Sequence, residues 1–323
     1  MIESSAARPS DAALREAFVE DVCAYLQRSP RQLPSKYFYD ALGSSLFDAI
    51  CRLPWYRITR SESALLSRHA RHILDPLARP VSLAELGCGS GEKLVVFASA
   101  AGEPFPSIQL VDISPAALDT ARDRLKALGV RSIVAHHATY VDGLERIARH
   151  RPGEGSLLVL FLGSNIGNFD PPVAGELLVR IRRTLHEGDA LLIGHDLIKP
   201  ERELLLAYDD PLRVTAAFNR NLLRRINDEL GGTFDLAGFA HRAVWNAVER
   251  RVEMHLVSRR HQHVRIAAGS FELTFEPDEY IWTESSYKYE ASQALDEGLA
   301  AGFTGGEQWI DADARFALTR LSV

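Results

Sequence analysis

An apolar run breaks into a glycine-rich turn in Leu83-Ala-Glu-Leu-Gly-Cys-Gly-Ser-Gly-Glu-Lys93. A second apolar run, residues 108–112, follows about one βαβ unit later and ends in Asp112. Glycines let the backbone approach a ligand closely, and an acid at a strand end suits a ribose diol. A dinucleotide-binding loop reads Gly-x-Gly-x-x-Gly, whereas the third glycine here comes one residue early, at Gly91. The turn therefore favours S-adenosylmethionine (SAM), which has no pyrophosphate; the alternative is a plain strand-to-helix turn.

The composition is that of a globular protein, since 46% of the 323 residues are hydrophobic and 25% are charged. A chain of this length can form one large or two modest domains. The formal net charge of −6 argues against nonspecific binding to nucleic acid or to an anionic membrane. No apolar run approaches the roughly 20 residues of a bilayer span, and the N-terminus lacks a signal-peptide pattern. Because Cys23, Cys51 and Cys88 suggest no disulfide framework either, we predict a soluble cytoplasmic protein.

Strand-like and helical segments alternate through the middle of the chain. The strand-like runs are 81–86, 108–112, 131–136, 156–162 and 189–195, and the helical segments between them are 91–101, 115–128, 141–149 and 171–184. Ser114-Pro115 adds a capping residue followed by proline at the first helical position. This alternation predicts a parallel, doubly wound sheet with ligands beyond the carboxyl ends of its strands.

The pattern changes on both sides of this region. Helices are expected over 11–27, 43–53 and 61–74, the last capped by Ser61, and a longer helical stretch over 199–230. Strand-like runs without helices between them follow at 239–246, 251–259, 262–267 and 271–275, which predicts a mostly antiparallel insertion. The expected C-terminal elements are a helix over 290–301 and an antiparallel hairpin over 303–310 and 315–322 on the sheet edge.

We therefore predict an α/β protein with a Rossmann-like, doubly wound sheet of seven strands whose last strand is antiparallel, which resembles SAM-dependent methyltransferases. A second, α+β domain that binds the substrate would be built from an N-terminal segment and an insertion. The expected boundaries are residues 1–60 for the N-terminal segment, 61–197 for the SAM-binding domain, 198–288 for the inserted substrate-binding domain and 289–323 for the C-terminal return to the sheet.

A polar loop follows the fourth strand of this sheet. In it two glycines bracket Ser164 and Asn165, and Asn168 comes next. An asparagine amide oxygen can accept a hydrogen bond from an amine N–H and so aim the nitrogen lone pair at a methyl donor. The alternative is that Asn168 only shapes a turn.

Specific motifs extend over nearly the whole chain, from about Leu33 to the C-terminus. They read Lys36-Tyr-Phe-Tyr-Asp-Ala-Leu-Gly-Ser-Ser-Leu-Phe47, Arg52-Leu-Pro-Trp-Tyr56, Phe161-Leu-Gly-Ser-Asn-Ile-Gly-Asn-Phe169, Ala207-Tyr-Asp-Asp210, Val214-Thr-Ala-Ala-Phe-Asn-Arg-Asn221, Arg251-Val-Glu-Met254 and Thr283-Glu-Ser-Ser-Tyr-Lys288. Together they resemble the L-histidine Nα-methyltransferases of ergothioneine biosynthesis. The resemblance, and not any spacing, implies L-histidine as substrate. Three methyl groups would pass from SAM to its α-amino group, giving the trimethylated betaine hercynine and S-adenosyl-L-homocysteine.

The resemblance also implies a substrate pocket drawn from distant parts of the chain. Its residues would be Tyr39, Tyr56, Gly163, Asn165, Asn168, Tyr208, Met254, Glu284 and Ser286. Tyr39 and Asn168 would orient the amine as catalytic residues. Tyr56 and Tyr208 would hold the substrate carboxylate. Met254 would pack on the imidazole, with ordinary core packing as the alternative.

Glu284 and Ser286 would hold the imidazole ring. Residues two apart on a strand point to the same side, so a carboxylate can accept one ring N–H while a hydroxyl meets the other ring nitrogen. The alternative is an exposed, solvated pair, the commoner environment of these residue types. The whole pocket presupposes a buried polar cleft between two lobes that presents the amine to the methyl donor.

The SAM contacts implied by the resemblance join the glycine-rich turn to later strand ends. They are Gly87, Lys93, Asp112, Thr139 and Tyr140, to which the turn itself adds Gly89. At Thr139-Tyr140 the family commonly has Asp-Phe. Tyr140 can still lie against adenine, but Thr139 cannot accept two hydrogen bonds as a carboxylate does. Asn165 replaces a threonine often found in the family, so a water-mediated substrate contact is open to rearrangement.

Three alternatives remain beside this interpretation. A nucleic-acid amine methyltransferase is opposed by the acidic charge and by Val173, which stands where an aromatic is expected. An enzyme for another amino acid or small amine, such as tryptophan, is opposed by Glu284, which an apolar ring would bury unpaired. A non-catalytic protein would bind SAM without consuming it. We expect a monomer. We also expect no metal, because His136-His137 and His261-Gln-His263 lack acidic or cysteine partners at ligand spacing.

Overall fold

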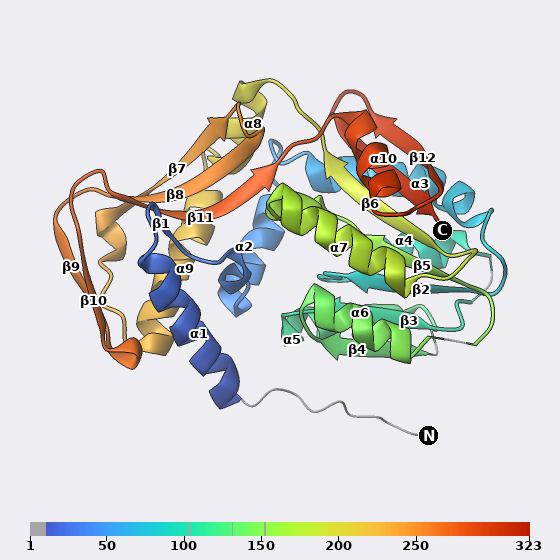
Figure 1. Ribbon diagram of the computed structural model, residues 1–323, viewed down its shortest axis with the longest axis horizontal. Helices are drawn as coiled ribbons and strands as arrows, with labels where there is room; N and C mark the ends of the chain where they lie inside the picture. Colours follow the sequence, from blue (N-terminus) through green and yellow to red (C-terminus); the bar gives the residue numbers. More distant parts are fainter. Residues whose placement is uncertain (1–10, 103, 131, 152) are drawn as a thin grey trace. The chain divides into compact units, whose positions relative to one another are not determined.

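The computed structural model describes residues 11–323 except 103, 131 and 152, so the first ten residues of the predicted N-terminal segment lie outside the described residues (Figure 1). The chain divides into two compact units. The first unit comprises the described part of Met1–Arg52 together with Leu204–Asn246 and Val252–Glu284, and the second comprises Leu53–Glu203, Ala247–Arg251 and Ser285–Val323.

The second unit is built on a seven-stranded sheet. Its strands are β2 (Val81–Leu86), β3 (Ile108–Asp112), β4 (Ile133–His137), β5 (Ser156–Phe161), β6 (Ala190–Asp196), β12 (Gly305–Asp311) and β13 (Phe316–Ser322), in the order β12-β13-β6-β5-β2-β3-β4. β2 pairs in parallel with β3 and β5, as β4 does with β3 and β6 with β5, whereas β13 runs antiparallel to β6 and β12. The predicted doubly wound sheet with an antiparallel last strand is confirmed.

Helices alternate with these strands and cover the sheet (Figure 1). They are α3 (Ile58–Leu74), α4 (Glu92–Ala100), α5 (Pro115–Ala127), α6 (Tyr140–Arg149), α7 (Pro171–Thr184) and α10 (Ala291–Ala300). On the face under α6 and α7, Leu144 and Leu178 join Val159 and Phe161 in the hydrophobic core. β2 and β5 are buried at every residue, because helices exclude water from both faces of a parallel sheet.

The two helix caps predicted in this unit have different outcomes. Ser114 caps α5 as expected, since its Oγ accepts the Ala117 N–H at 3.4 Å and the helix begins with Pro115. The predicted cap at Ser61 is wrong. α3 begins at Ile58, whose buried side chain extends the apolar face of the helix by one turn, and Ser61 lies buried within the helix.

The first unit combines helices with two small sheets. Its helices are α1 (Asp11–Leu26), α2 (Ala41–Cys51), α9 (Val214–Leu230) and most of α8 (Glu201–Tyr208). One sheet has the order β1-β11-β8-β7, from β1 (Arg31–Gln32), β11 (Tyr280–Tyr287), β8 (Arg251–Ser258) and β7 (Phe239–Asn246), and the other pairs β9 (Gln262–Ile266) with β10 (Phe271–Phe275) in antiparallel. The strands expected in the insertion are present, and β1 adds a parallel pairing with β11. In the described part of the chain, no helix is both long and apolar enough to cross a membrane.

The helical stretch predicted over 199–230 is divided into two helices. α8 ends at Tyr208 and α9 begins at Val214. Between them, the Asp210 carboxylate accepts the N–H groups of Val214 at 3.2 Å and Thr215 at 2.7 Å, so it caps the start of α9. Burial acts to raise the pKa of Asp210, but these hydrogen bonds prevail and lower it below its ordinary value. Pro211 follows, which has no N–H to continue α8.

Candidate functional site

The glycine-rich turn joins β2 to α4 in the second unit. Gly87, Gly89 and Gly91 have φ angles of 75°, 50° and 75°, in the left-handed region that favours glycine. A Cβ on Gly91 would lie 2.9 Å from the Cβ of Ala121, so α5 leaves no room for a side chain there. A Cβ on Gly89 would meet nothing within 4 Å. The turn thus packs on one side against α5 and is open at Gly89, as a ligand-binding loop requires.

Asp112 ends β3 and fixes this turn. Its Oδ2 accepts the Gly89 N–H at 3.0 Å, and its Oδ1 accepts the Ser114 N–H at 2.9 Å. Burial raises the pKa of Asp112, while both hydrogen bonds act in the opposite direction. Each carboxylate oxygen retains a second acceptor position, so the side chain can still bind a ribose diol.

Glu62 of α3 connects two predicted site residues and was missed in the sequence. Its Oε1 accepts the Gly163 N–H at 2.6 Å, and its Oε2 lies 2.7 Å from the Nζ of Lys93. Glu62 is fully buried, and most of the other buried residues on its face of the helix are apolar. An acid on the apolar face of an amphipathic helix was the signal that could have indicated it, because a buried carboxylate requires a partner.

Glu85, near the end of β2, is a second buried acid beside this pair. Among the described residues, no group donates a hydrogen bond to either of its carboxylate oxygens. Burial raises the pKa of Glu85 to about 8, Lys93 acts to lower it, and Glu62 and Asp112 raise it further. The Glu85 carboxyl is therefore mostly neutral at pH 7.

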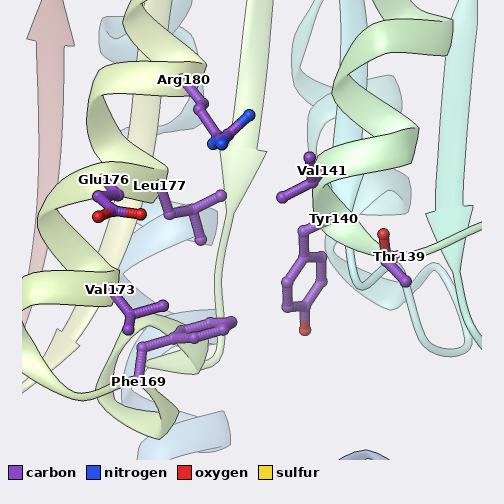
Figure 2. Close-up of a pocket in the computed structure, with 8 residues that line it drawn as sticks. All are labelled: Thr139, Tyr140, Val141, Phe169, Val173, Glu176, Leu177 and Arg180. Carbon is purple, nitrogen blue, oxygen red and sulfur yellow. The ribbon is translucent and has the colours of Figure 1, made fainter.

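Tyr140 and Thr139 line a pocket of about 250 Å³ between α6 and α7 (Figure 2). Its lining residues are Thr139, Tyr140, Val141, Phe169, Val173, Glu176, Leu177 and Arg180. The Tyr140 ring lies edge-on to Phe161, at 5.1 Å between centroids, and to Phe169 at 6.0 Å. Thr139 caps α6, since its Oγ1 accepts the Asp142 N–H at 3.3 Å and donates to Asp142 Oδ2 at 2.9 Å. Its one hydroxyl hydrogen therefore already has an acceptor.

The loop after β5 lies beside the glycine-rich turn. It forms a short 3-10 helix, Asn165–Asn168, preceded by Ser164 in a left-handed conformation. A Cβ on Gly87 would lie 3.0 Å from both Asn165 Nδ2 and the Tyr140 hydroxyl. The structure therefore brings Gly87, Asn165 and Tyr140 together at the carboxyl ends of the strands. Asn168, also predicted here, is half-buried at the end of the same short helix.

The substrate residues predicted in the second unit also include Tyr56 and Ser286. Both are buried, at 7% and 4% exposure. Tyr56 precedes α3, and its backbone N–H donates to the Leu53 carbonyl at 3.2 Å. Ser286 lies on β11, where its Oγ accepts a hydrogen bond from Lys288 Nζ at 2.8 Å.

The other predicted substrate residues belong to the first unit. Tyr39 is half-buried, with its ring edge-on to Phe47 at 5.6 Å between centroids. Tyr208 ends α8, and its carbonyl lies 2.8 Å from His241 Nε2. Met254 is buried on β8, and Glu284 is half-buried on the neighbouring strand β11. The roles of all these residues in substrate binding stay predictions.

Three of the histidines considered as metal ligands contact glutamate or glutamine side chains. His261 and His263 are exposed, with Nδ1 of His261 3.0 Å from Glu276 and Nε2 of His263 3.5 Å from Glu272. His136 is buried, with its Nε2 3.0 Å from Gln109 Oε1. Within the described residues, no group of three or more His, Cys, Asp or Glu side chains is placed to hold a metal ion.

Comparison with known proteins gives the family of this chain. The family model for histidine-specific, SAM-dependent methyltransferases matches residues 18–323. The chain belongs to this family. It is 40% identical to the histidine N-alpha-methyltransferase of Mycolicibacterium smegmatis and 36% identical to that of Mycobacterium tuberculosis, with 94% of each chain covered in both comparisons. A solved SAM-dependent methyltransferase from Clostridium acetobutylicum is 10% identical, with a TM-score of 0.47 over 86% of this chain and 98% of that one.

The protein is thus a SAM-dependent methyltransferase, as predicted. The residues of its second unit fit SAM in three respects. The turn is open at Gly89, the Asp112 carboxylate retains acceptor positions for a diol, and Lys93 provides a cation for a carboxylate. Thr139 and Tyr140 stand at the start of α6 and both line the pocket between α6 and α7.

Proposed function

We propose that this methyltransferase transfers three methyl groups from SAM to the α-amino group of L-histidine, giving hercynine, the first step of ergothioneine biosynthesis. The observation that carries the proposal is the 40% identity, over 94% of each chain, to a protein named histidine N-alpha-methyltransferase. The pair of polar side chains on β11 supports it. Neither Glu284 nor Ser286 is exposed, and their spacing along the strand directs both to one side.

In the proposed complex, the substrate is held by its ring and by its carboxylate. Glu284 accepts one imidazole N–H, and Ser286 meets the other ring nitrogen. Met254 packs on the ring, while the hydroxyls of Tyr56 and Tyr208 bind the carboxylate. The first unit, with its N-terminal segment and insertion, supports the proposal of a substrate-binding domain joined to a SAM-binding one.

SAM supplies an electrophilic methyl group on its sulfonium. Gly87, Gly89 and Asp112 would hold its nucleoside part, Lys93 its carboxylate and Tyr140 its adenine. The attacking amine must be unprotonated, and because α-amino groups titrate near pH 8 in peptides, a strong base is unnecessary. Tyr39 and Asn168 would accept hydrogen bonds from the amine and align its lone pair, and alignment is the main source of acceleration in such a site.

The same residues account for repetition and arrest. Each methyl removes one N–H that Tyr39 or Asn168 could accept. The growing cation can rest against tyrosine faces, a contact worth about 1 kcal/mol. After the third transfer the nitrogen has no lone pair, so the reaction stops. Chemistry of this kind uses no metal and no nucleic acid or membrane partner, and we propose that one chain suffices.

The test is to incubate the protein with SAM and each amino acid and to measure mass gains of one, two and three methyl groups. We expect all three with histidine and none with tryptophan. Mass gains only with another amino acid or a small amine would show that histidine is not the substrate. SAM binding without consumption would show that the protein is not a catalyst. Glu284→Ala is expected to abolish the preference for histidine, whereas Glu272→Ala, an exposed glutamate on β10, serves as control.

Asn168→Ala separates catalysis from SAM binding. It is expected to lower the rate of methyl transfer about 100-fold, because an amine that is not aligned attacks poorly. SAM affinity measured by calorimetry should change by less than about threefold, the order of one neutral hydrogen bond. Equal losses in rate and in SAM affinity would contradict the role of Asn168 at the amine.

A further inference from the structure

A buried group of charged side chains lies behind Ser286 in the second unit. Lys288 Nζ is 3.0 Å from Asp196 Oδ2 and donates to Ser286 Oγ at 2.8 Å. Lys199 Nζ is 2.5 Å from the other oxygen of Asp196 and donates to the Ala314 carbonyl at 2.8 Å. Two lysines therefore share one aspartate, and one of them reaches a predicted substrate residue.

Burying these charged side chains costs free energy of folding. The side chains of Lys288 and Asp196 are 0% and 2% exposed, and that of Lys199 is 8% exposed. Removing charged groups from water costs several kcal/mol for each ion, and well-packed apolar residues of similar volume are often as stable or more so. Two ammonium groups on one carboxylate also leave a net positive charge. Stability alone therefore gives no reason for Lys288.

We propose that Lys288 is a positioning residue that fixes the Ser286 hydroxyl as a hydrogen-bond donor toward the substrate. An ammonium group can only donate, so Ser286 Oγ accepts from Lys288 and its own hydrogen points away from Lys288. Asp196 holds the ammonium in place for this contact.

The donor direction determines how the ring is read, and this step rests on the proposed function. A neutral imidazole has one N–H and one bare nitrogen. The Glu284 carboxylate can only accept, so it takes the N–H. Ser286, held as a donor, takes the bare nitrogen. The two side chains then select one ring orientation and one tautomer, and Lys288 acts on substrate specificity through Ser286.

The experiment is a double-mutant cycle on KM for histidine, with kcat and SAM affinity measured in parallel. Lys288→Met is expected to raise KM about tenfold, the order of one hydrogen bond to a charged group, while kcat changes by less than about twofold. Lys199→Met is the matched control, because it removes an ion pair to the same aspartate and leaves the contact between Lys288 and Ser286 in place. It should leave KM within about twofold of the wild type, because Ser286 Oγ still accepts its hydrogen bond from Lys288.

Coupling to Ser286 decides between positioning and simple support of the fold. In a Ser286→Ala background, Lys288→Met should change KM by less than about twofold, because the group through which it acts is absent. An equal rise in KM in both backgrounds, or a similar rise for Lys199→Met, would overturn the proposal. Lys288→Arg, which keeps a donor, should reverse most of the rise in KM. If Lys288→Met no longer binds SAM, Lys288→Gln takes its place in the cycle. Wild-type turnover of histidine tests the proposed function separately, so the two failures are distinguishable.

Discussion

Replacing Glu85 by glutamine should change how the stability of the protein depends on pH. Glu85 is buried beside the glycine-rich turn, and burial raises the pKa of its carboxyl from 4.5 to about 8. Glutamine has nearly the same shape and does not titrate. The difference between the two proteins therefore isolates the protonation of a single side chain.

The sign of the effect follows from the raised pKa. Below pH 4.5 the Glu85 carboxyl is protonated in both the folded and the unfolded chain, and its contribution to stability is complete. As the pH rises toward about 8, the unfolded chain loses this proton while the folded chain retains it, so the free energy of unfolding falls. The whole window corresponds to about 5 kcal/mol, of which about 3 kcal/mol is lost by pH 7. Glu85→Gln escapes this loss.

The measurement is urea unfolding of the wild type and of Glu85→Gln, without SAM, at pH 5, 6, 7 and 8. The free energy of unfolding of the variant, relative to the wild type, should increase by about 3 to 4 kcal/mol between pH 5 and pH 8. Glu145→Gln is the control, because it makes the same substitution at a glutamate whose side chain is 62% exposed. A difference for Glu85→Gln that stays constant within about 1 kcal/mol would mean that the folded protein holds an ionised Glu85, and would refute the reasoning.

Three further predictions concern the glycine-rich turn and the proposed SAM site. Thr139→Asp, which restores the acid common in the family and is an equally good helix cap, should tighten SAM binding about fivefold by calorimetry, and unchanged affinity would remove this position from the adenine contact. Gly89→Ala, at an open position with φ of 50°, should cost about 1 kcal/mol of stability but weaken SAM binding more than tenfold. Gly91→Ala, whose Cβ would meet Ala121 at 2.9 Å, should instead cost about 3 kcal/mol in denaturant unfolding. The reverse order of stability losses would contradict the packing of the turn.

The parallel sheet was predictable because its signals are local. Strands such as β2 and β5 are continuous apolar runs, and each is followed by a turn and an amphipathic helix. The predicted limits of the five parallel strands agree with the observed ones to within two residues, and those of β2 are identical. The glycine-rich turn and Asp112 could be placed at the same edge of the sheet, because the carboxyl ends of parallel strands meet there.

The errors arose where a side chain overrode the periodic pattern. Apolar residues continue at helical spacing through 199–230, but Asp210 binds the N–H groups that begin α9 and so ends one helix before the next. At Ser61 a good capping residue lies inside a helix, because the buried side chain of Ile58 starts the apolar face earlier. At 199–230 the local signals of Asp210 and Pro211 were missed, whereas at Ser61 the packing of Ile58 determined the outcome.

The part of the site that the sequence could not indicate is the set of buried partners behind the motif residues. Glu62 contacts Gly163, which lies 101 positions away in the sequence, and Asp196 ends β6 whereas Lys288 directly follows β11. No pattern within one segment connects such residues, because their pairing depends on how the sheet brings distant strand ends together. In the structure, however, each partner can be recognised by its burial. Removing a charged side chain from water costs free energy, so a buried charge persists only where another group compensates it. In this protein the buried charges contact residues that we propose to bind a ligand: Glu62 contacts Lys93 and Gly163, and Lys288, which pairs with Asp196, donates to Ser286. Motif residues and their buried partners therefore act as pairs, and we expect removal of the buried member to alter ligand binding as well as stability.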